Sequence, residues 1–192
     1  MEVAVERTYP RNGIHPKKFA LLLACASMVM MFAGLTSAYL VRQAAGNWLE
    51  FQLPVIFSVN TGVILLSSIL LHASYQSFRK GKETLYRWFL SAAVLLGFGF
   101  LVLQYQGWLE LQKIGIELST NPSGSFVYAI SGIHAAHVLG GVAALVMALV
   151  HAFVLPYKVT TQRKLRFELT LIYWHFVDLL WVYLFVFLLI QR

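Results

Sequence analysis

The strongest constraint in this chain is a set of five long apolar runs, at residues 19–41, 54–75, 85–106, 125–155 and 169–190. Each run can cross the hydrocarbon layer of a bilayer as an α-helix, which takes about 20 apolar residues. Only 12% of all residues are charged, well below the share found in soluble domains. The pattern predicts an all-α, polytopic transmembrane bundle. It would consist of a short N-terminal segment, residues 1–18, and a single five-helix transmembrane domain, residues 19–192.

The basic residues predict the orientation of this bundle. Of the fifteen lysines and arginines, all but Arg42, Lys113 and Arg192 lie in the N-terminal segment or near the connections after the second and fourth runs. Lysine and arginine accumulate on the cytoplasmic side of membrane proteins. We therefore expect a cytoplasmic N-terminus and a periplasmic C-terminus. Because the basic residues cluster between apolar runs and not along a soluble face, the net charge of +7 does not predict a nucleic-acid partner.

Several ionisable residues lie inside the apolar runs, where each is costly unless it has a partner or a task. His134 and His137 are three residues apart and share a face of the fourth predicted helix, as His175 and Asp178 do on the fifth. The two pairs fall at similar depth, and consecutive antiparallel helices are usually neighbours. We therefore expect Asp178 to pair with His175 or with a histidine of the fourth helix.

From the residues alone, this group allows three interpretations. It could ligate a metal ion, it could relay protons, or it could be a polar lock that fixes how two helices pack. Two histidines three residues apart are a weak metal signal, so the lock is our default. The residues to which we assign a structural polar role are His134, His137, His175, Asp178, Glu168 and Asn60.

Other features predict helix packing. Gly140 and Gly141 should let another helix approach closely, and Asn60 should hydrogen-bond to another helix, as should Gln104. Trp174 and Trp181 are seven residues apart and so share a stripe, which we expect to contact lipid or a partner protein.

Several short motifs lie along the chain: NT at 60–61, LLSS at 65–68 with His72, GIHAAHV at 132–138, FE at 167–168 and YWHFVDLLW at 173–181. Together they resemble the motifs of subunit III of cytochrome c oxidase and related haem-copper oxidases. The resemblance covers the chain from about residue 19 to the C-terminus, with the motifs in order. Larger relatives have seven spans, and this chain is similar to the short bacterial forms with five.

The resemblance implies a non-catalytic subunit of a proton-pumping cytochrome c oxidase in the bacterial inner membrane, serving aerobic respiration. It implies subunit I as the main partner, with subunit II, small subunits and a larger respiratory assembly as further partners. Haem and copper would lie in the partner subunits, and this subunit would hold no cofactor of its own. Its implied roles are to stabilise subunit I, to bind phospholipid and to support proton uptake.

Carried over residue by residue, the resemblance matches His137 and His151 to lipid-contacting positions. The chain departs from the family pattern at Met28, Ser37 and Gly107, where relatives usually carry glutamate, tryptophan and glutamate. The electron donor is left open, because quinol oxidases and nitric oxide reductase systems carry similar subunits. A transporter or a metalloprotein is the more distant alternative, and would show transport or bound metal in the isolated chain.

A second set of residues bears on proton uptake. His15, His72, Glu83, His151 and Glu168 are all expected on or near the cytoplasmic side. A surface that mixes imidazoles with carboxylates can hold and pass protons near neutral pH. These five residues therefore form a hypothetical proton-collecting surface.

Overall fold

The computed structural model describes residues 14–118 and 121–191. Within this part, the chain forms five α-helices and no strand: α1 (Pro16–Ala44), α2 (Ile56–Arg79), α3 (Glu83–Lys113), α4 (Pro122–Val154) and α5 (Thr161–Ile190). All five are long and apolar enough to cross a membrane, which confirms the predicted all-α, five-span architecture. Of the predicted N-terminal segment, residues 1–13 lie outside the described residues, and Pro16 to Lys18 belong to α1.

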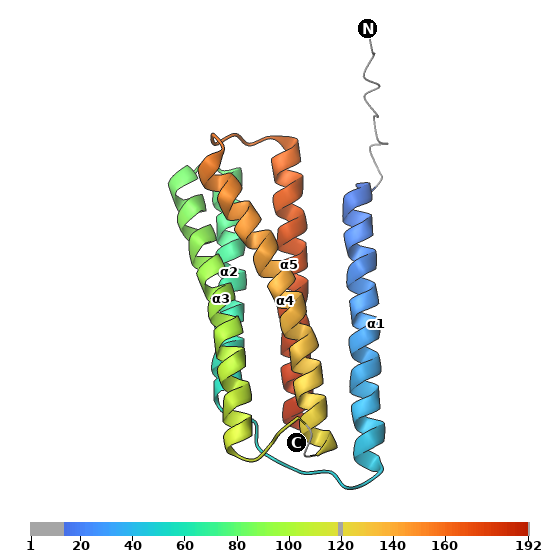
Figure 1. The fold of residues 1–192 in the computed structure, drawn as a ribbon. Coiled ribbons are helices and arrows are strands. Elements are labelled where there is room, and N and C mark those ends of the chain that lie inside the picture. Colours follow the sequence, from blue (N-terminus) through green and yellow to red (C-terminus); the bar gives the residue numbers. More distant parts are fainter. Residues whose placement is uncertain (1–13, 119–120, 192) are drawn as a thin grey trace.

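Local sequence explains where the helices begin and end. Pro122 occupies the first turn of α4, and the side chain of Asn121 accepts a hydrogen bond from the Ser123 amide at 2.9 Å. Gly81 and Gly115 follow the ends of α2 and α3 with φ of 74° and 82°, a conformation that glycine adopts without steric cost. Consecutive helices run antiparallel, and the connections α2–α3 and α4–α5 are short (Figure 1).

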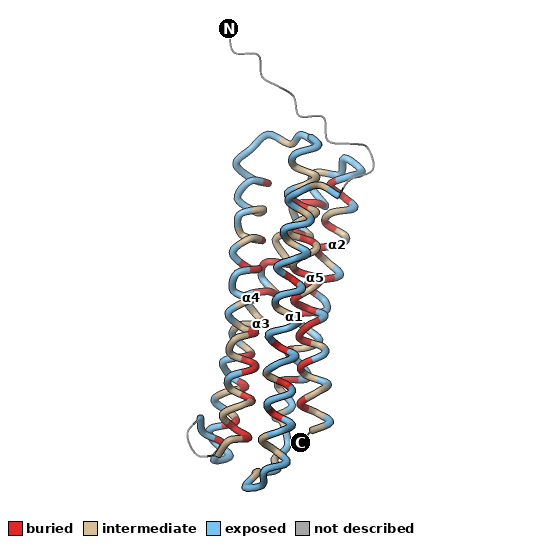
Figure 2. Tube along the Cα trace, turned by 90° about the vertical axis from the view of Figure 1, so that its right-hand side faces the viewer, coloured by how far each residue is buried: buried red, intermediate tan, exposed pale blue. Residues whose placement is uncertain are grey.

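Four of the helices form a ring. α2 packs on α3, α3 on α4, α4 on α5, and α5 closes the ring on α2, whereas α1 contacts only α4 and α5 (Figure 1). The buried residues face the inside of this ring, and much of α1 is exposed (Figure 2). The buried residues of α1 lie on one stripe: Cys25, Phe32, Thr36 and Tyr39.

Glycines make room for a large aromatic side chain in the core. A Cβ atom added at Gly97 or at Gly141 would lie 2.9 Å from the indole of the fully buried Trp174. The expected close approach at Gly141 is therefore confirmed. The expectation that Trp174 and Trp181 contact lipid or a partner was wrong, because both tryptophans are fully buried inside the ring.

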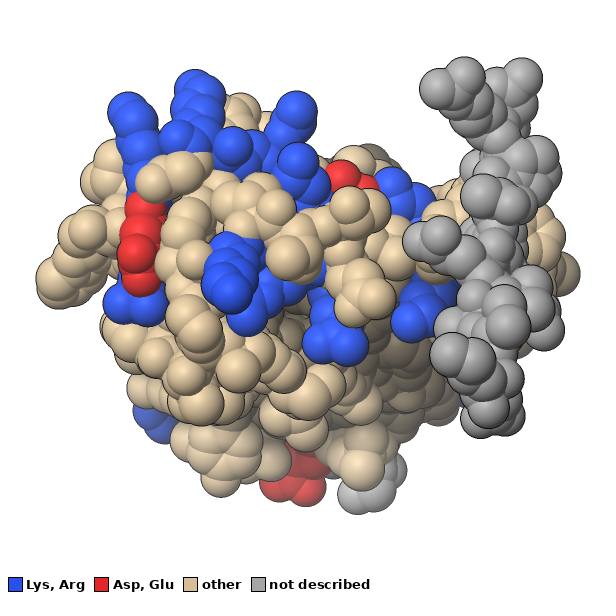
Figure 3. All heavy atoms as spheres, turned by 90° about the horizontal axis from the view of Figure 1, so that it is seen from above, with Lys and Arg blue, Asp and Glu red and all other residues tan. Residues whose placement is uncertain are grey.

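One end of the bundle is strongly basic, and we call it the basic end. Here α1, α3 and α5 begin and α2 and α4 end, and lysine and arginine side chains gather over its surface (Figure 3). Its acidic side chains in the described helices are both ion-paired, Glu83 with Arg87 at 2.6 Å and Glu168 with Lys18 at 2.5 Å. The basic residues of this end are Lys17, Lys18, Arg79, Lys80, Lys82, Arg87, Lys158, Arg163, Lys164 and Arg166.

Candidate functional site

Polar side chains join α2 to α5 along the whole depth of the bundle, and we call this series the α2–α5 ladder. Its rungs are the hydrogen bonds Tyr75 to Glu168 (2.5 Å), Ser68 to His175, and Trp181 to Thr61 (3.0 Å). On α2, the three rungs are seven residues apart and so lie on one face. Hydrogen bonds between transmembrane helices contribute about 0.6 kcal/mol each on average. The ladder therefore fixes both the register and the rotation of α5 against α2.

The ladder gives His175 a different partner from the expected one. Its Nδ1 bonds to Ser68 of α2, and its ring centroid lies 5.8 Å from that of His72, also on α2. Asp178 is buried, and no histidine among the described residues donates a hydrogen bond to its carboxyl oxygens. The predicted pairing of Asp178 with a histidine was therefore wrong. Although the two residues are three apart, His175 lies in the α2–α5 seam and Asp178 in the core.

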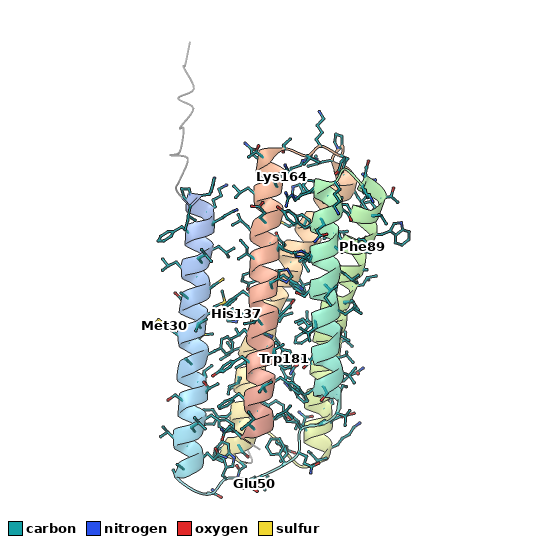
Figure 4. All side chains as sticks on the ribbon, turned by 180° about the vertical axis from the view of Figure 1, so that it is seen from behind. Met30, Glu50, Phe89, His137, Lys164 and Trp181 are labelled. Atoms are coloured by element: carbon teal, nitrogen blue, oxygen red, sulfur yellow. The ribbon has the colours of Figure 1, made fainter. Side chains whose placement is uncertain are left out.

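The two histidines of α4 have separate surroundings. His134 is fully buried and stacks on Trp181, with ring centroids 4.9 Å apart and a tilt of 28°. His137 donates from Nδ1 to the carbonyl of Ile133 at 2.8 Å, and its ring lies 5.7 Å from Phe32 of α1. Trp181 lies on the α2 side of α5, whereas His137 lies between α1 and α5 (Figure 4).

The predicted polar set is thus spread over several contacts and does not form one cluster. Asn60 donates to Gln104 Oε1 at 3.0 Å, which confirms that each of the two amides hydrogen-bonds to another helix. Glu168 binds Lys18 and Tyr75 near the basic end. Among the described residues, no three His, Cys, Asp or Glu side chains lie close enough together to hold a metal ion. The described residues therefore do not offer a metal ion a set of three ligands, and we derive no chemical step through one.

A pocket of about 450 Å³ opens between α4 and α5 at the basic end. Its walls are mainly apolar, and its polar lining comes from basic and hydroxyl side chains. A lining of this kind can accept a lipid, with the acyl chain on the apolar walls and the acidic head group at the basic side chains. We call it the basic-end pocket, and its lining residues are Phe78, Tyr86, Ala144, Met147, Ala148, His151, Ala152, Leu155, Tyr157, Arg163, Arg166, Phe167, Leu169 and Thr170.

Loop and helix contacts fix the polar lining of this pocket. The Tyr157 hydroxyl donates to the carbonyl of Phe78 at 2.6 Å, and Arg163 donates to the carbonyl of Pro156 at 2.7 Å. Burial raises the pKa of the Tyr157 phenol, and nearby Glu83 raises it further, so the phenol stays a neutral hydrogen-bond donor. His151 donates from Nδ1 to the carbonyl of Met147 at 2.7 Å.

Of the two predicted lipid contacts, His151 lines the pocket and His137 does not. The sequence reasoning missed Arg163 and Arg166, which it used only to predict orientation. The available signal was their spacing, because residues three apart on a helix share a face.

The five residues of the hypothetical proton-collecting surface occupy different surroundings. His15 caps α1 by accepting a hydrogen bond from the Lys17 amide at 3.2 Å, and His72 faces His175. His151 lines the basic-end pocket, and both carboxylates of the set are ion-paired. All five lie in the half of the bundle nearer the basic end, and their role in proton transfer stays a prediction.

Comparisons with known proteins agree with the resemblance. The family model for cytochrome c oxidase subunit III matches residues 11–191. A cytochrome c oxidase subunit 3 of Corynebacterium diphtheriae is 33% identical over 192 residues, which cover 95% of this chain and 92% of that protein. A probable cytochrome c oxidase subunit 3 of Nocardia farcinica is 31% identical, covering 94% and 90% of the two chains. The mouse cytochrome c oxidase subunit 3 is 26% identical, and the match covers 88% of this chain and 67% of the mouse protein.

Proposed function

Since the chain belongs to the cytochrome c oxidase subunit III family, we propose that it is the non-catalytic subunit III of a proton-pumping cytochrome c oxidase in a bacterial inner membrane. The observation that carries this proposal is the family match over nearly the whole chain, on a bundle of five membrane-spanning helices. Subunit I is the main partner in this proposal and subunit II the second. Haem and copper belong to those partners.

The proposed contribution of this chain is structural. Several of its buried polar groups fix helix packing, through the α2–α5 ladder, the Asn60–Gln104 contact and the stacking of His134 on Trp181. A bundle held in one register offers subunit I a constant surface. We place the basic end in the cytoplasm, because the excess of lysine and arginine at that end matches the usual topology of membrane proteins.

The proposal assigns phospholipid binding to the basic-end pocket. Arg163, Arg166 and His151 would hold the phosphate, and the apolar walls would hold part of an acyl chain. The pocket lies at the end of the bundle that we place in the cytoplasmic leaflet, which is where anionic lipids accumulate.

Support of proton uptake into subunit I is the remaining part of the proposal. Its basis is the position of His15, His72 and His151 in the half of the bundle that we assign to the cytoplasmic side, the side from which a proton pump takes protons. Imidazoles can exchange protons near neutral pH, so they could supply the entrance of a pathway in subunit I.

The experiment that tests this function is purification of the tagged chain from its native membrane in mild detergent. We expect it to copurify with haem- and copper-bearing subunits. A bimetallic copper centre in the copurifying subunit II would identify cytochrome c as the electron donor, and its absence would favour a quinol. Recovery of the native chain without any haem protein would contradict the proposal.

A further inference from the structure

The contacts that hold α1 to the bundle are distributed unevenly along its length. At the end away from the basic end, the Tyr39 hydroxyl and the Gln43 amide both donate to the carbonyl of Gln191, each at 3.2 Å. Tyr39 also packs edge-on against Trp48 of the following loop, with ring centroids 4.6 Å apart. Further along, the Thr36 hydroxyl is 3.0 Å from the Tyr183 hydroxyl of α5. This half of α1 is therefore firmly anchored.

The half of α1 near the basic end has much weaker support. Between Pro16 and Met31, Cys25 is the one buried side chain in the described helix. Over the same stretch, the structure describes one polar contact to another helix, the ion pair of Lys18 with Glu168 of α5 at 2.5 Å. The two side chains are 33% and 29% exposed, and ion pairs that water can reach contribute little to stability.

The face of α4 that packs on α1 at His137 continues, seven residues later, into the lining of the basic-end pocket at Ala144. The pocket is lined by α4 and α5 together with Phe78, Tyr86 and Tyr157, and no α1 residue lines it, although α1 packs on α4 and α5. At the basic end, α4 leans away from α1 (Figure 1). The basic end of α1 thus borders the side from which a lipid would enter the pocket out of the bilayer.

We propose that the Lys18–Glu168 ion pair is a latch, which holds the basic end of α1 on α5 and so controls lateral entry of lipid into the basic-end pocket. Glu168 is itself fixed by the hydroxyl of Tyr75, so the α5 side of the latch is rigid. The α1 side carries the motion, with the Tyr39 contacts as its pivot. The inference rests on the lipid-binding part of the proposed function.

Two measurements on the purified oxidase complex test the latch. The first is the distance between spin labels on α1 and α4, after the single native cysteine, Cys25, has been replaced by alanine. Exposed positions 22 and 150 report on the basic end, and exposed positions 41 and 129 on the anchored end. The second is the rate at which deuterated phosphatidylglycerol replaces bound lipid, followed by native mass spectrometry.

The variant Glu168→Gln removes the ion pair but keeps a group that can bond to Tyr75. We expect a broader distance distribution for labels at 22 and 150, and an unchanged one for labels at 41 and 129. Lipid exchange should become about two- to fivefold faster, which is the change in equilibrium constant expected when an ion pair of this exposure is lost. Lys17→Gln is the matched control, because it removes one charge from the same turn of α1 and leaves the Lys18–Glu168 pair in place. The double variant Lys18→Glu with Glu168→Lys should restore slow exchange.

The latch proposal is contradicted if Glu168→Gln behaves like Lys17→Gln in both measurements, or if the distance distributions of both label pairs broaden equally. A separate outcome concerns the proposed function alone. If the wild-type complex takes up no phosphatidylglycerol, the lipid-binding proposal fails, whatever the label distances show.

Discussion

Trp174 of α5 lies so close to Gly141 of α4 that a Cβ atom at position 141 would stand 2.9 Å from the indole Cε3 and 3.0 Å from Cζ3. The indole is fully buried and also fills the space beside Gly97 of α3. One side chain therefore connects three helices of the ring. Its position depends on two residues that have no side chain.

Replacing Gly141 with alanine is expected to destabilise the bundle. The added methyl group meets a rigid, enclosed ring, and overpacking of this kind costs about 1–3 kcal/mol. Gly140→Ala is the matched control, because its Cβ would meet only the Tyr173 hydroxyl, at 3.6 Å. Thermal unfolding of the purified complex should show a lower apparent Tm for Gly141→Ala and an equal or higher one for Gly140→Ala. Equal losses in the two variants would contradict the packing described.

The α2–α5 ladder predicts a second stability effect. Ser68→Ala removes the hydrogen-bond partner of His175 Nδ1 in a half-buried seam, so we expect a loss of about 0.5–2 kcal/mol. Ser58→Ala changes an exposed serine of the same helix and should leave the stability unchanged. The check is the urea or thermal unfolding of both variants in one detergent. If Ser68→Ala leaves the stability unchanged, the hydrogen bond between Ser68 and His175 does not contribute to it.

The basic-end pocket predicts how lipid binding responds to charge. Arg166→Gln should weaken retention of phosphatidylglycerol about fivefold, the usual contribution of one basic residue near an anionic membrane surface. His151→Arg should strengthen it, because arginine carries a permanent charge and a bidentate set of donors. Lys113→Gln, at the opposite end of the bundle, is the control. Native mass spectrometry of each complex measures the bound lipid, and equal retention in all three variants would exclude the pocket as the site.

The hypothetical proton-collecting surface predicts a pH-dependent loss of turnover. A triple variant in which glutamine replaces His15, His72 and His151 should consume oxygen more slowly at alkaline pH, where protons in solution are scarce. At acidic pH the substitutions should have little effect. The measurement is the turnover of the purified oxidase across this pH range. An unchanged pH profile would remove these residues from the proton pathway.

The sequence was sufficient for the helices and for some of their contacts. The five spans follow from hydropathy alone, and Asn60 and Gln104 were each expected to hydrogen-bond to another helix, as they do. The partner of His175 did not follow, because α5 packs on α2 as well as on its sequence neighbour α4. A contact between helices distant in the sequence leaves no local pattern. The available signal was the seven-residue spacing of Thr61, Ser68 and Tyr75, which our prediction did not use.

The candidate site shows the same limit. The number of lysines and arginines at each end of the predicted spans was sufficient to predict the orientation in the membrane. Which of them enclose a pocket depends on how α4 and α5 diverge at the basic end, and side-chain periodicity does not encode that divergence. Trp174 and Trp181 were misplaced for a related reason. In a membrane protein an apolar stripe can face lipid or the core, and hydropathy does not distinguish the two environments.

The most direct test of the central claim is a visible absorption spectrum, with identification of the protein chains, on the complex purified through this subunit. The account predicts haem absorption and copurifying subunits I and II, with both lost when the chain is isolated from them. If the isolated chain instead holds stoichiometric haem, copper, iron or zinc, or is abundant in the membrane without any haem-bearing companion, its assignment as a structural oxidase subunit is contradicted.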